Sequence, residues 1–304
     1  MLAIIALLLA AESATLSNEV AVSPAVKALA RKYAPNVTAE FETELEALEK
    51  GGDASAAALL GELLMMPNRQ GGPDFVRSCD HSEAAGRYPE GLQNLATCYF
   101  RGQGRSRDLG KARDLYHQAA DQGYAQAACA YGNMLIAGQG GPIDIPRGLD
   151  LCRRAADAGI PDAQTDYGIY LLTGKYTARD PATARHYLSL AANHGQANAA
   201  FLLGQIYWNG DGVDKNGPDA ALWWIRAYDG GRKDAPFLIG TAAMRIVVEG
   251  AQAKHEVPTV AIEQARRWLG IAAKEDPDAE KREKAKELLG LLDQLLGGGS
   301  KKGG

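Results

Sequence analysis

The four cysteines and five histidines of this 304-residue chain are the residues that could form disulfides or bind a metal ion. Cys79, Asp80 and His81 are consecutive and, together with Cys98, supply the residue types of a zinc site. The histidines share no ligand spacing, and four cysteines can instead form two disulfides by three different pairings or remain four small buried residues. We expect no metal site, and the pairing depends on the elements that carry the cysteines.

Motifs of enzymatic catalysis are missing from the sequence. His255 and Glu256 are followed by Val257 and Pro258, so the zinc-protease pattern is not completed. No Gly-x-Ser-x-Gly, P-loop or Ser-x-x-Lys motif occurs either. We therefore expect a protein that is not an enzyme and needs no cofactor. The net charge of −4 also argues against a nucleic-acid partner, which would require a basic face.

Small residues recur in this chain with a period of 36. One column holds Gly132, Gly168, Gly204 and Gly240, a second holds Gly123, Gly159, Gly195 and Gly231, and a third holds Ala127, Ala163, Ala199 and Ala235. A fixed period of this length is typical of a solenoid, in which each repeat packs against its neighbours and all share one continuous core.

Each period predicts two helices joined by a glycine-rich turn. Apolar residues four apart, such as Ala127 and Tyr131, mark one face of a first helix, and the glycines between Gly138 and Gly141 end it. Asp144 can cap a second helix, which Gly159 ends. The small columns allow the helices to approach closely, while bulky residues fill the space beside them.

We place six repeats in the chain, at residues 53–88, 89–124, 125–160, 161–196, 197–232 and 233–275. The last repeat has about nine extra residues, which we place near Glu249–Pro258, in the turn between its helices. We expect N-terminal capping helices within residues 20–52 and a charged C-terminal capping helix at 276–296. The glycine-rich residues 297–304 read as a flexible tail.

The N-terminus resembles a signal peptide. Residues 2–11 are all apolar and small residues follow, although no basic residue precedes them. Residues 1–14 therefore predict export to the periplasm or the medium, with a buried N-terminal helix as the alternative. Ten apolar residues are too few to span a bilayer, and we expect no transmembrane segment in the mature chain.

The repeat motif itself resembles that of a known family. Leu203-Gly-x-x-Tyr-x-x-Gly-x-Gly-Val213 is followed by Ala220-x-x-Trp-Trp224 and by Gly231. This pattern is similar to the Sel-1-like repeat family, a relative of the tetratricopeptide repeats. The resemblance implies an all-α, right-handed α/α superhelical solenoid whose first helices line a concave groove. It also implies a scaffold or adaptor role. Gly148, which replaces the alanine of the second helix, departs from the family pattern.

The repeat boundaries indicate which cysteines can meet. Cys129 and Cys152 lie on the two helices of one repeat, symmetric about the turn between them. Cys79 and Cys98 are likewise symmetric about the turn between two repeats. We therefore predict the disulfides Cys79–Cys98 and Cys129–Cys152, which resemble the clasps of a cysteine-rich bacterial branch of the family. Four unpaired buried cysteines remain the alternative for a chain kept in the cytosol.

Polar side chains on the first helices are the candidate binding residues. Their positions are counted from the column of Gly132, Gly168 and Gly204, in which Ala96 takes the same place one period earlier. They lie two residues before that column, directly after it or about one turn after it. If the first helices line the groove, the side chains that face it are Asn94, Thr97, Arg101, Asn133, Asp166, Thr173, Gln205 and Asn209. An ordinary solvated face is the alternative for any one of them. Trp208 is either an aromatic anchor or a core residue.

The sequence thus predicts an exported, monomeric, non-catalytic scaffold that binds a protein or peptide in its concave groove. The alternative is a periplasmic binder of a glycan, peptidoglycan or a β-lactam-type small ligand. A third class, a host-directed effector, would differ in being found outside the cell.

Overall fold

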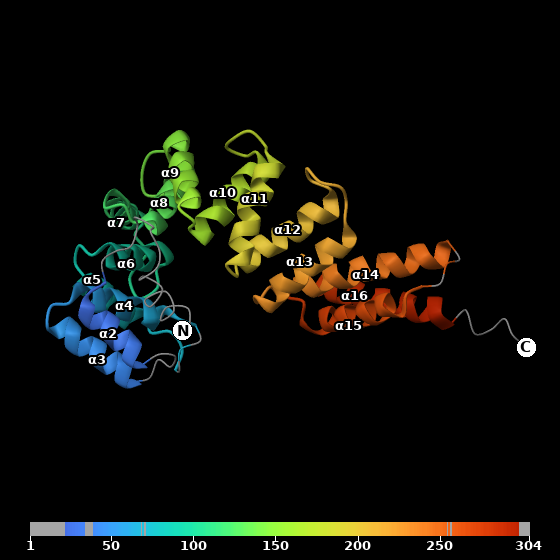
Figure 1. The fold of residues 1–304 in the computed structure, drawn as a ribbon, viewed down its shortest axis with the longest axis horizontal. Coiled ribbons are helices and arrows are strands. Elements are labelled where there is room, and N and C mark those ends of the chain that lie inside the picture. The colour runs from blue at the N-terminus through green and yellow to red at the C-terminus, as the bar shows by residue number, and fades with distance from the viewer. Residues whose placement is uncertain are drawn as a thin grey trace, which may run out of the picture. The chain divides into compact units, whose positions relative to one another are not determined.

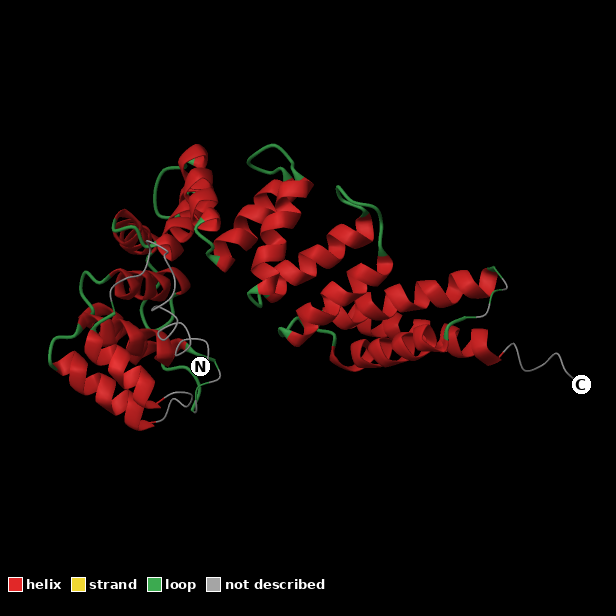
Figure 2. Cartoon of the chain, in the orientation of Figure 1, coloured by secondary structure: helices red, strands yellow, loops and turns green. Residues whose placement is uncertain are grey.

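The computed structural model describes residues 22–33, 39–67, 69, 71–253, 255 and 257–297. These residues form fifteen helices and no strand, which confirms the predicted all-α fold (Figures 1 and 2). The predicted signal peptide at residues 1–14 lies outside the described residues. Within the described part of the chain, no helix has the length and apolar character needed to cross a bilayer.

The helices follow one another with a regular spacing. They are α2 (Pro24–Tyr33), α3 (Ala39–Lys50), α4 (Ala54–Met65), α5 (Phe75–Ala84), α6 (Pro89–Arg101), α7 (Leu109–Asp121), α8 (Ala125–Ala137), α9 (Ile145–Asp157), α10 (Pro161–Thr173), α11 (Pro181–Asn193), α12 (Ala197–Asn209), α13 (Gly217–Asp229), α14 (Ala235–Gln252), α15 (Thr259–Glu275) and α16 (Ala279–Gly297). The even-numbered helices from α4 to α14 are the first helices of their repeats, and the odd-numbered helices from α5 to α15 are the second helices. The chain divides into two compact units, Met1–Ala163 (unit 1) and Gln164–Gly304 (unit 2).

The helix boundaries arise from two recurring caps. Asp74, Asp108 and Asp144 each accept a backbone hydrogen bond at the start of a second helix, as Asp180 and Asn216 do in unit 2. Gly102, Gly138, Gly174 and Gly210 follow the first helices with φ between 65° and 77°, the left-handed conformation that glycine adopts without strain. The period of 36 in the sequence is therefore the period of helix starts and stops.

In unit 1, three pairs of helices follow α2 and α3. The pairs α4–α5, α6–α7 and α8–α9 pack in succession, and α3 packs on α4. Three glutamates of α3 reach side chains in the turn after α4 and on α5. Glu42 pairs with Arg69 at 2.9 Å, Glu46 with Arg77 at 2.6 Å, and Glu49 lies 2.8 Å from His81. Helix α3 is thus joined to α4 and α5 by polar contacts as well as by apolar packing.

The glycine column lies where first and second helices approach most closely. A Cβ atom at position 132 would lie 2.6 Å from the carbonyl oxygen of Gly148, and one at position 148 would lie 2.5 Å from that of Gly132. Gly148, the departure from the family pattern, is therefore the second half of a backbone-to-backbone contact between α8 and α9. In unit 2, Gly204 leaves room for the indole of Trp224, whose Nε1 donates to the Phe201 oxygen at 3.2 Å.

In unit 2, the helices from α11 to α16 pack on one another in succession, and two apolar clusters lie among them. One centres on Trp224, Ile239 and Trp268, and the other on Met244 and Leu269. The extra residues of the last repeat were expected in the turn between its helices, and that expectation is wrong. They lengthen both helices, to 18 residues in α14 and 17 in α15, against 13 in each helix of the preceding repeats from α6 to α13.

The cause of the longer α14 is a missing stop signal. Ile246 stands 36 residues after Gly210, at the position where the earlier first helices meet their terminal glycine. A branched side chain does not favour the left-handed cap, so the helix continues to Gln252.

Candidate binding surface and disulfides

Both predicted cysteine pairs come together in unit 1. The sulfur atoms of Cys79 and Cys98 are 2.15 Å apart, and those of Cys129 and Cys152 are 2.14 Å apart. The first disulfide joins α5 to α6, and thus two successive repeats, while the second joins α8 to α9 within one repeat. All four side chains are buried. The zinc alternative for Cys79 and Cys98 finds no support, since the described residues contain no group of three metal-binding side chains.

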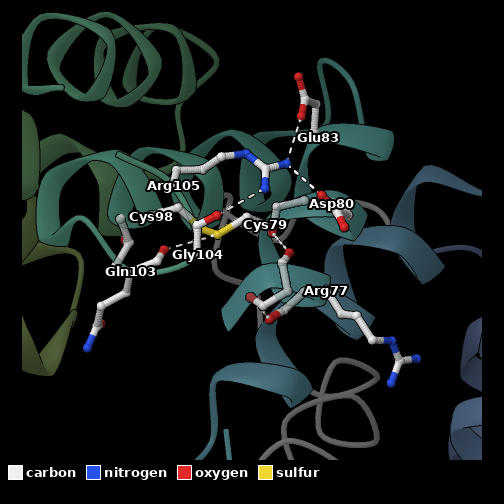
Figure 3. Close-up of a disulfide and its surroundings, with 12 residues drawn as sticks. Arg77, Cys79, Asp80, Glu83, Cys98, Gln103, Gly104 and Arg105 are labelled. Carbon is white, nitrogen blue, oxygen red and sulfur yellow. Dashed lines mark hydrogen bonds and ion pairs between the residues drawn. A yellow bond between two sulfur atoms is a disulfide. The ribbon is translucent and has the colours of Figure 1, made fainter. Parts of the chain in front are cut away.

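The turn after α6 folds over the first disulfide (Figure 3). The carbonyl oxygen of Gln103 lies 3.3 Å from the sulfur of Cys79, and a Cβ atom at Gly104 would lie 2.6 Å from that sulfur. Arg105 then reaches back to α5, where its guanidinium pairs with Asp80 at 2.7 Å and with Glu83 at 3.0 Å. The disulfide is therefore covered by the backbone of this turn, which the ion pairs of Arg105 with Asp80 and Glu83 hold against α5.

The candidate binding residues of unit 1 differ in how far their side chains are already engaged. Asn94 donates to the Ala58 oxygen of α4 at 3.3 Å, which ties two first helices together. The Thr97 hydroxyl donates to the Gln93 oxygen at 3.0 Å and lies 2.9 Å from the Tyr116 hydroxyl.

Asn133 and Arg101 complete the candidates of unit 1. The Asn133 oxygen lies 3.4 Å from the sulfur of Cys152, beside the second disulfide. Arg101, at the end of α6, is exposed. Asn94, Thr97 and Asn133 thus contribute contacts within the protein, and Arg101 is the candidate of this unit that reaches solvent.

The candidates of unit 2 lie on α10 and α12. Thr173 is exposed, with its hydroxyl donating to the Ile169 oxygen of its own helix at 2.8 Å, and Asp166 is half-buried. Gln205 is half-buried on α12, and Asn209 at the end of that helix is exposed and donates to Asp211 at 3.3 Å. Trp208 is half-buried against the cluster around Trp224, with the Arg245 guanidinium 5.4 Å above its ring. Trp208 thus packs against the apolar cluster, and the guanidinium of Arg245 lies over its ring.

The structure adds a polar cluster at the start of the first helices that sequence reasoning missed. The Gln93 amide of α6 donates to the Gln126 oxygen of α8 at 3.4 Å, and the Tyr124 hydroxyl donates to the same oxygen at 2.7 Å. Tyr124 also approaches the Glu90 carboxylate at 3.5 Å. Burial and the nearby charge of Glu62 raise the pKa of Glu90 to about 7.

A signal for this cluster was present in the sequence. Polar side chains recur with the 36-residue period at the start of every first helix from α6 onward. Glu90, Gln126, Asp162 and Asn198 are the second residues of their helices, and Asp234 directly precedes α14. In unit 2, Arg232 uses two of them, pairing with Asp234 at 2.6 Å and donating to Asn198 at 2.8 Å. This column therefore joins neighbouring repeats, which is why only the packed structure shows what its members do.

Each unit also contains a cavity that the sequence did not indicate. The cavity of unit 1 has a volume of about 440 Å³ and lies between α7 and α9, around Gly123. The cavity of unit 2 has a volume of about 380 Å³ and surrounds Gly195. Gly123 and Gly195 are two periods apart, and Arg154 and Arg226, which line the two cavities, are separated by the same interval. The same place in the repeat is thus hollow in both units.

Comparison with solved structures shows the same architecture elsewhere. A Sel1 repeat protein from Oxalobacter formigenes is 23% identical, with a TM-score of 0.59 over 82% of this chain and 94% of that one. The protective antigen c5321 of uropathogenic Escherichia coli, described as having an SLR fold, is 22% identical, with a TM-score of 0.57 over 78% of this chain. The match spans about half (49%) of that antigen's length. These identities show a shared fold, and no curated protein matches the chain.

The sequence pattern of the Sel1 repeat provides the family. It matches residues 89–124, 125–160, 161–196, 197–231 and 257–277, which together make up more than half of the chain. Because this match covers more than half of the chain and two solved structures of Sel1-type proteins share its fold, the chain belongs to the Sel1 repeat family.

Proposed function

We infer that this protein is an exported, non-catalytic scaffold that binds a protein or peptide along its first helices. The observation that carries this proposal is the recurrence of an exposed polar side chain at the last residue of three first helices, where Arg101, Thr173 and Asn209 end α6, α10 and α12. Such a row offers donors and acceptors at regular intervals, which suits an extended chain better than a compact small molecule. Arg101 and Asn209 are exposed, and Gln205 is half-buried one turn before Asn209. Thr173 is exposed as well, but its hydroxyl already donates to a carbonyl of its own helix.

Export is supported by the two buried disulfides. Paired cysteines form and persist in oxidising compartments and are rare in the cytosol. The apolar residues 2–11 add the sequence feature expected of a signal peptide. Export to the periplasm or beyond therefore belongs to the proposal.

In-cell crosslinking of tagged protein, followed by capture and mass spectrometry, tests the scaffold function. The test variant combines Arg101→Glu, Gln205→Glu and Asn209→Glu, which change the surface without removing the internal contacts of Asn94 or Asn133. The control is Lys274→Glu, an exposed position on the second helix α15. We expect one or more proteins to be enriched with the wild type and the control, and lost with the triple variant. Equal enrichment with all three proteins would contradict a binding site on the first helices.

A further inference from the structure

The cavity of unit 1 lies among three helices, with the first helix α8 contributing Ala125, Ala128 and Tyr131 to its lining. It opens between α7 and α9, two successive second helices, and its volume of about 440 Å³ falls in the range of small-ligand pockets. Tyr131 and Leu151 provide apolar walls, while Arg147, Arg154, Asp121 and Asp150 provide the charged groups. The question is which of these charges remain available to a ligand.

The two acidic residues of the cavity differ in how they are engaged. Asp150 lies 2.8 Å from the guanidinium of Arg153, an arginine that does not line the cavity. Asp121 lies 3.3 Å from the His117 ring nitrogen. Asp150 therefore has a charged donor before any ligand arrives, whereas Asp121 is 65% exposed and shares the His117 Nε2 atom with the Arg147 guanidinium.

The two arginines are much less engaged. The Arg147 guanidinium lies 5.5 Å from the centre of the Tyr131 ring and 3.4 Å from the His117 nitrogen, with no described carboxylate within 4.0 Å. The Arg154 side chain is 69% exposed and reaches Asp150 only at 4.0 Å, a separation too long for a hydrogen bond. The cavity thus presents two guanidinium groups without a close anion, beside an aromatic wall.

We propose that this cavity is a second binding site, which takes a carboxylate carried on a short peptide segment. Guanidinium groups bind carboxylates through paired N–H donors, and partial enclosure strengthens that contact relative to open water. Tyr131 and Leu151 would contact the apolar atoms next to the carboxylate. The volume admits about one to three residues. The carboxylate comes either from an acidic side chain or from a peptide C-terminus.

Unit 2 contains a natural comparison for this site. Its cavity has Arg226 at the position of Arg154, and that guanidinium is stacked 4.6 Å from the centre of the Trp223 ring. The position of Arg147 is taken by Asp219 two periods later. The cavity of unit 2 therefore has one arginine, Arg226, which is stacked on a ring, and Asp219 replaces the second arginine. Because an aspartate repels a carboxylate, we expect binding in unit 1 alone.

Fluorescence anisotropy with short labelled peptides tests the proposal on the full chain. The probes are amidated Ala-Glu-Leu-Glu-Ala, amidated Ala-Gln-Leu-Gln-Ala, and Ala-Gln-Leu-Gln-Ala with a free C-terminal carboxylate. We expect the first or the third to bind and the second to bind at least about tenfold more weakly. Which of the two binds distinguishes an acidic side chain from a C-terminus.

Arg147→Gln and Arg154→Gln should each weaken binding about tenfold, and the double variant should abolish it. Arg226→Gln, the matched position in unit 2, should leave binding unchanged. If the Arg147 variant melts early, Arg154→Gln alone decides, because its exposed side chain has little structural role.

Three outcomes would overturn the second site. The first is that neither carboxylate probe binds at about 1 mM protein, a concentration at which even a weak site would show binding. The others are equal binding of the neutral peptide, and binding unaffected by the arginine substitutions. Binding lost with Gln205→Glu and Asn209→Glu but kept in the arginine double variant would place the peptide on the first helices. That result would reject this cavity and leave the proposed scaffold function standing.

Discussion

Gly132 and Gly148 show how single residues determine the spacing of the helices. Each has the carbonyl oxygen of the other within 2.6 Å of where a Cβ would stand. A backbone atom cannot rotate away as a side chain can, so an added methyl group must separate α8 from α9. We expect Gly132→Ala to lower the free energy of unfolding by about 1–3 kcal/mol, measured by urea denaturation.

Gly270 provides the matched control for that substitution. It lies within α15, but no atom lies within 4 Å of a Cβ placed there. Gly270→Ala should therefore raise stability by about 0.5–1 kcal/mol, because alanine loses less backbone entropy on forming a helix. If both variants lose stability to the same extent, helix propensity rather than close packing would be the reason for the glycine column.

The environment of Glu90 predicts how the stability of the protein depends on pH. Burial and the charge of Glu62 raise its pKa from 4.5 to about 7 in the folded protein. A carboxyl whose pKa is higher in the folded state than in the unfolded state reduces stability as the pH rises from about 4.5 through 7. Glu90→Gln should therefore stabilise the protein by about 1–2 kcal/mol at pH 8 and have little effect at pH 4.5. Glu287→Gln on the exposed face of α16 is the control and should show no such pH dependence.

At the scale of the helices, the second disulfide joins the two members of one pair. Cys129 and Cys152 are 23 residues apart, and closing a loop of that length in the unfolded chain contributes about 3 kcal/mol. Cys129→Ser should lower stability by about that amount. It should also release one free thiol in protein denatured without reductant, whereas the wild type should show none. Four free thiols in the wild type would contradict both disulfides and remove the main support for export.

The helix pairs themselves could be predicted from the sequence because their signals are local. Asp144 and Gly138 act within a few residues of the boundaries that they determine, and each recurs every 36 residues. The longer α14 was missed because the decisive signal there is the lack of a glycine at Ile246. An absent stop is harder to recognise than a present one.

The candidate binding residues could be placed on their helices but not assigned a role. Asn94 and Thr97 look like surface residues in the sequence, yet one bonds to α4 and the other to a neighbouring tyrosine. The partner in each case lies 19 or more residues away, on a different helix. The cavity between α7 and α9 has the same origin, because its walls belong to two consecutive repeats. Such features arise from packing between repeats and have no signature within a single one.

At the scale of the whole molecule, both disulfides lie in unit 1, and unit 2 contains no cysteine. In a stack whose repeats contact only their neighbours, the loss of a constraint is felt mainly where it occurs. Reduction should therefore destabilise unit 1 by up to about 3 kcal/mol for each disulfide and leave unit 2 nearly unchanged. Hydrogen exchange followed by mass spectrometry, in moderate urea with and without a reductant, measures both units in one experiment.

We expect amides of α8 and α9 to exchange faster by at least about tenfold after reduction, while those of α14 and α15 keep their rates. A variant with all four cysteines replaced by serine is the control and should not respond to the reductant. Equal acceleration in α14 would mean that the two units unfold as one cooperative block. The position of the disulfides would then have no local consequence, and oxidation would act on the stability of the entire chain. Acceleration confined to unit 1 would instead mean that oxidation selectively stabilises the unit that contains the cavity between α7 and α9.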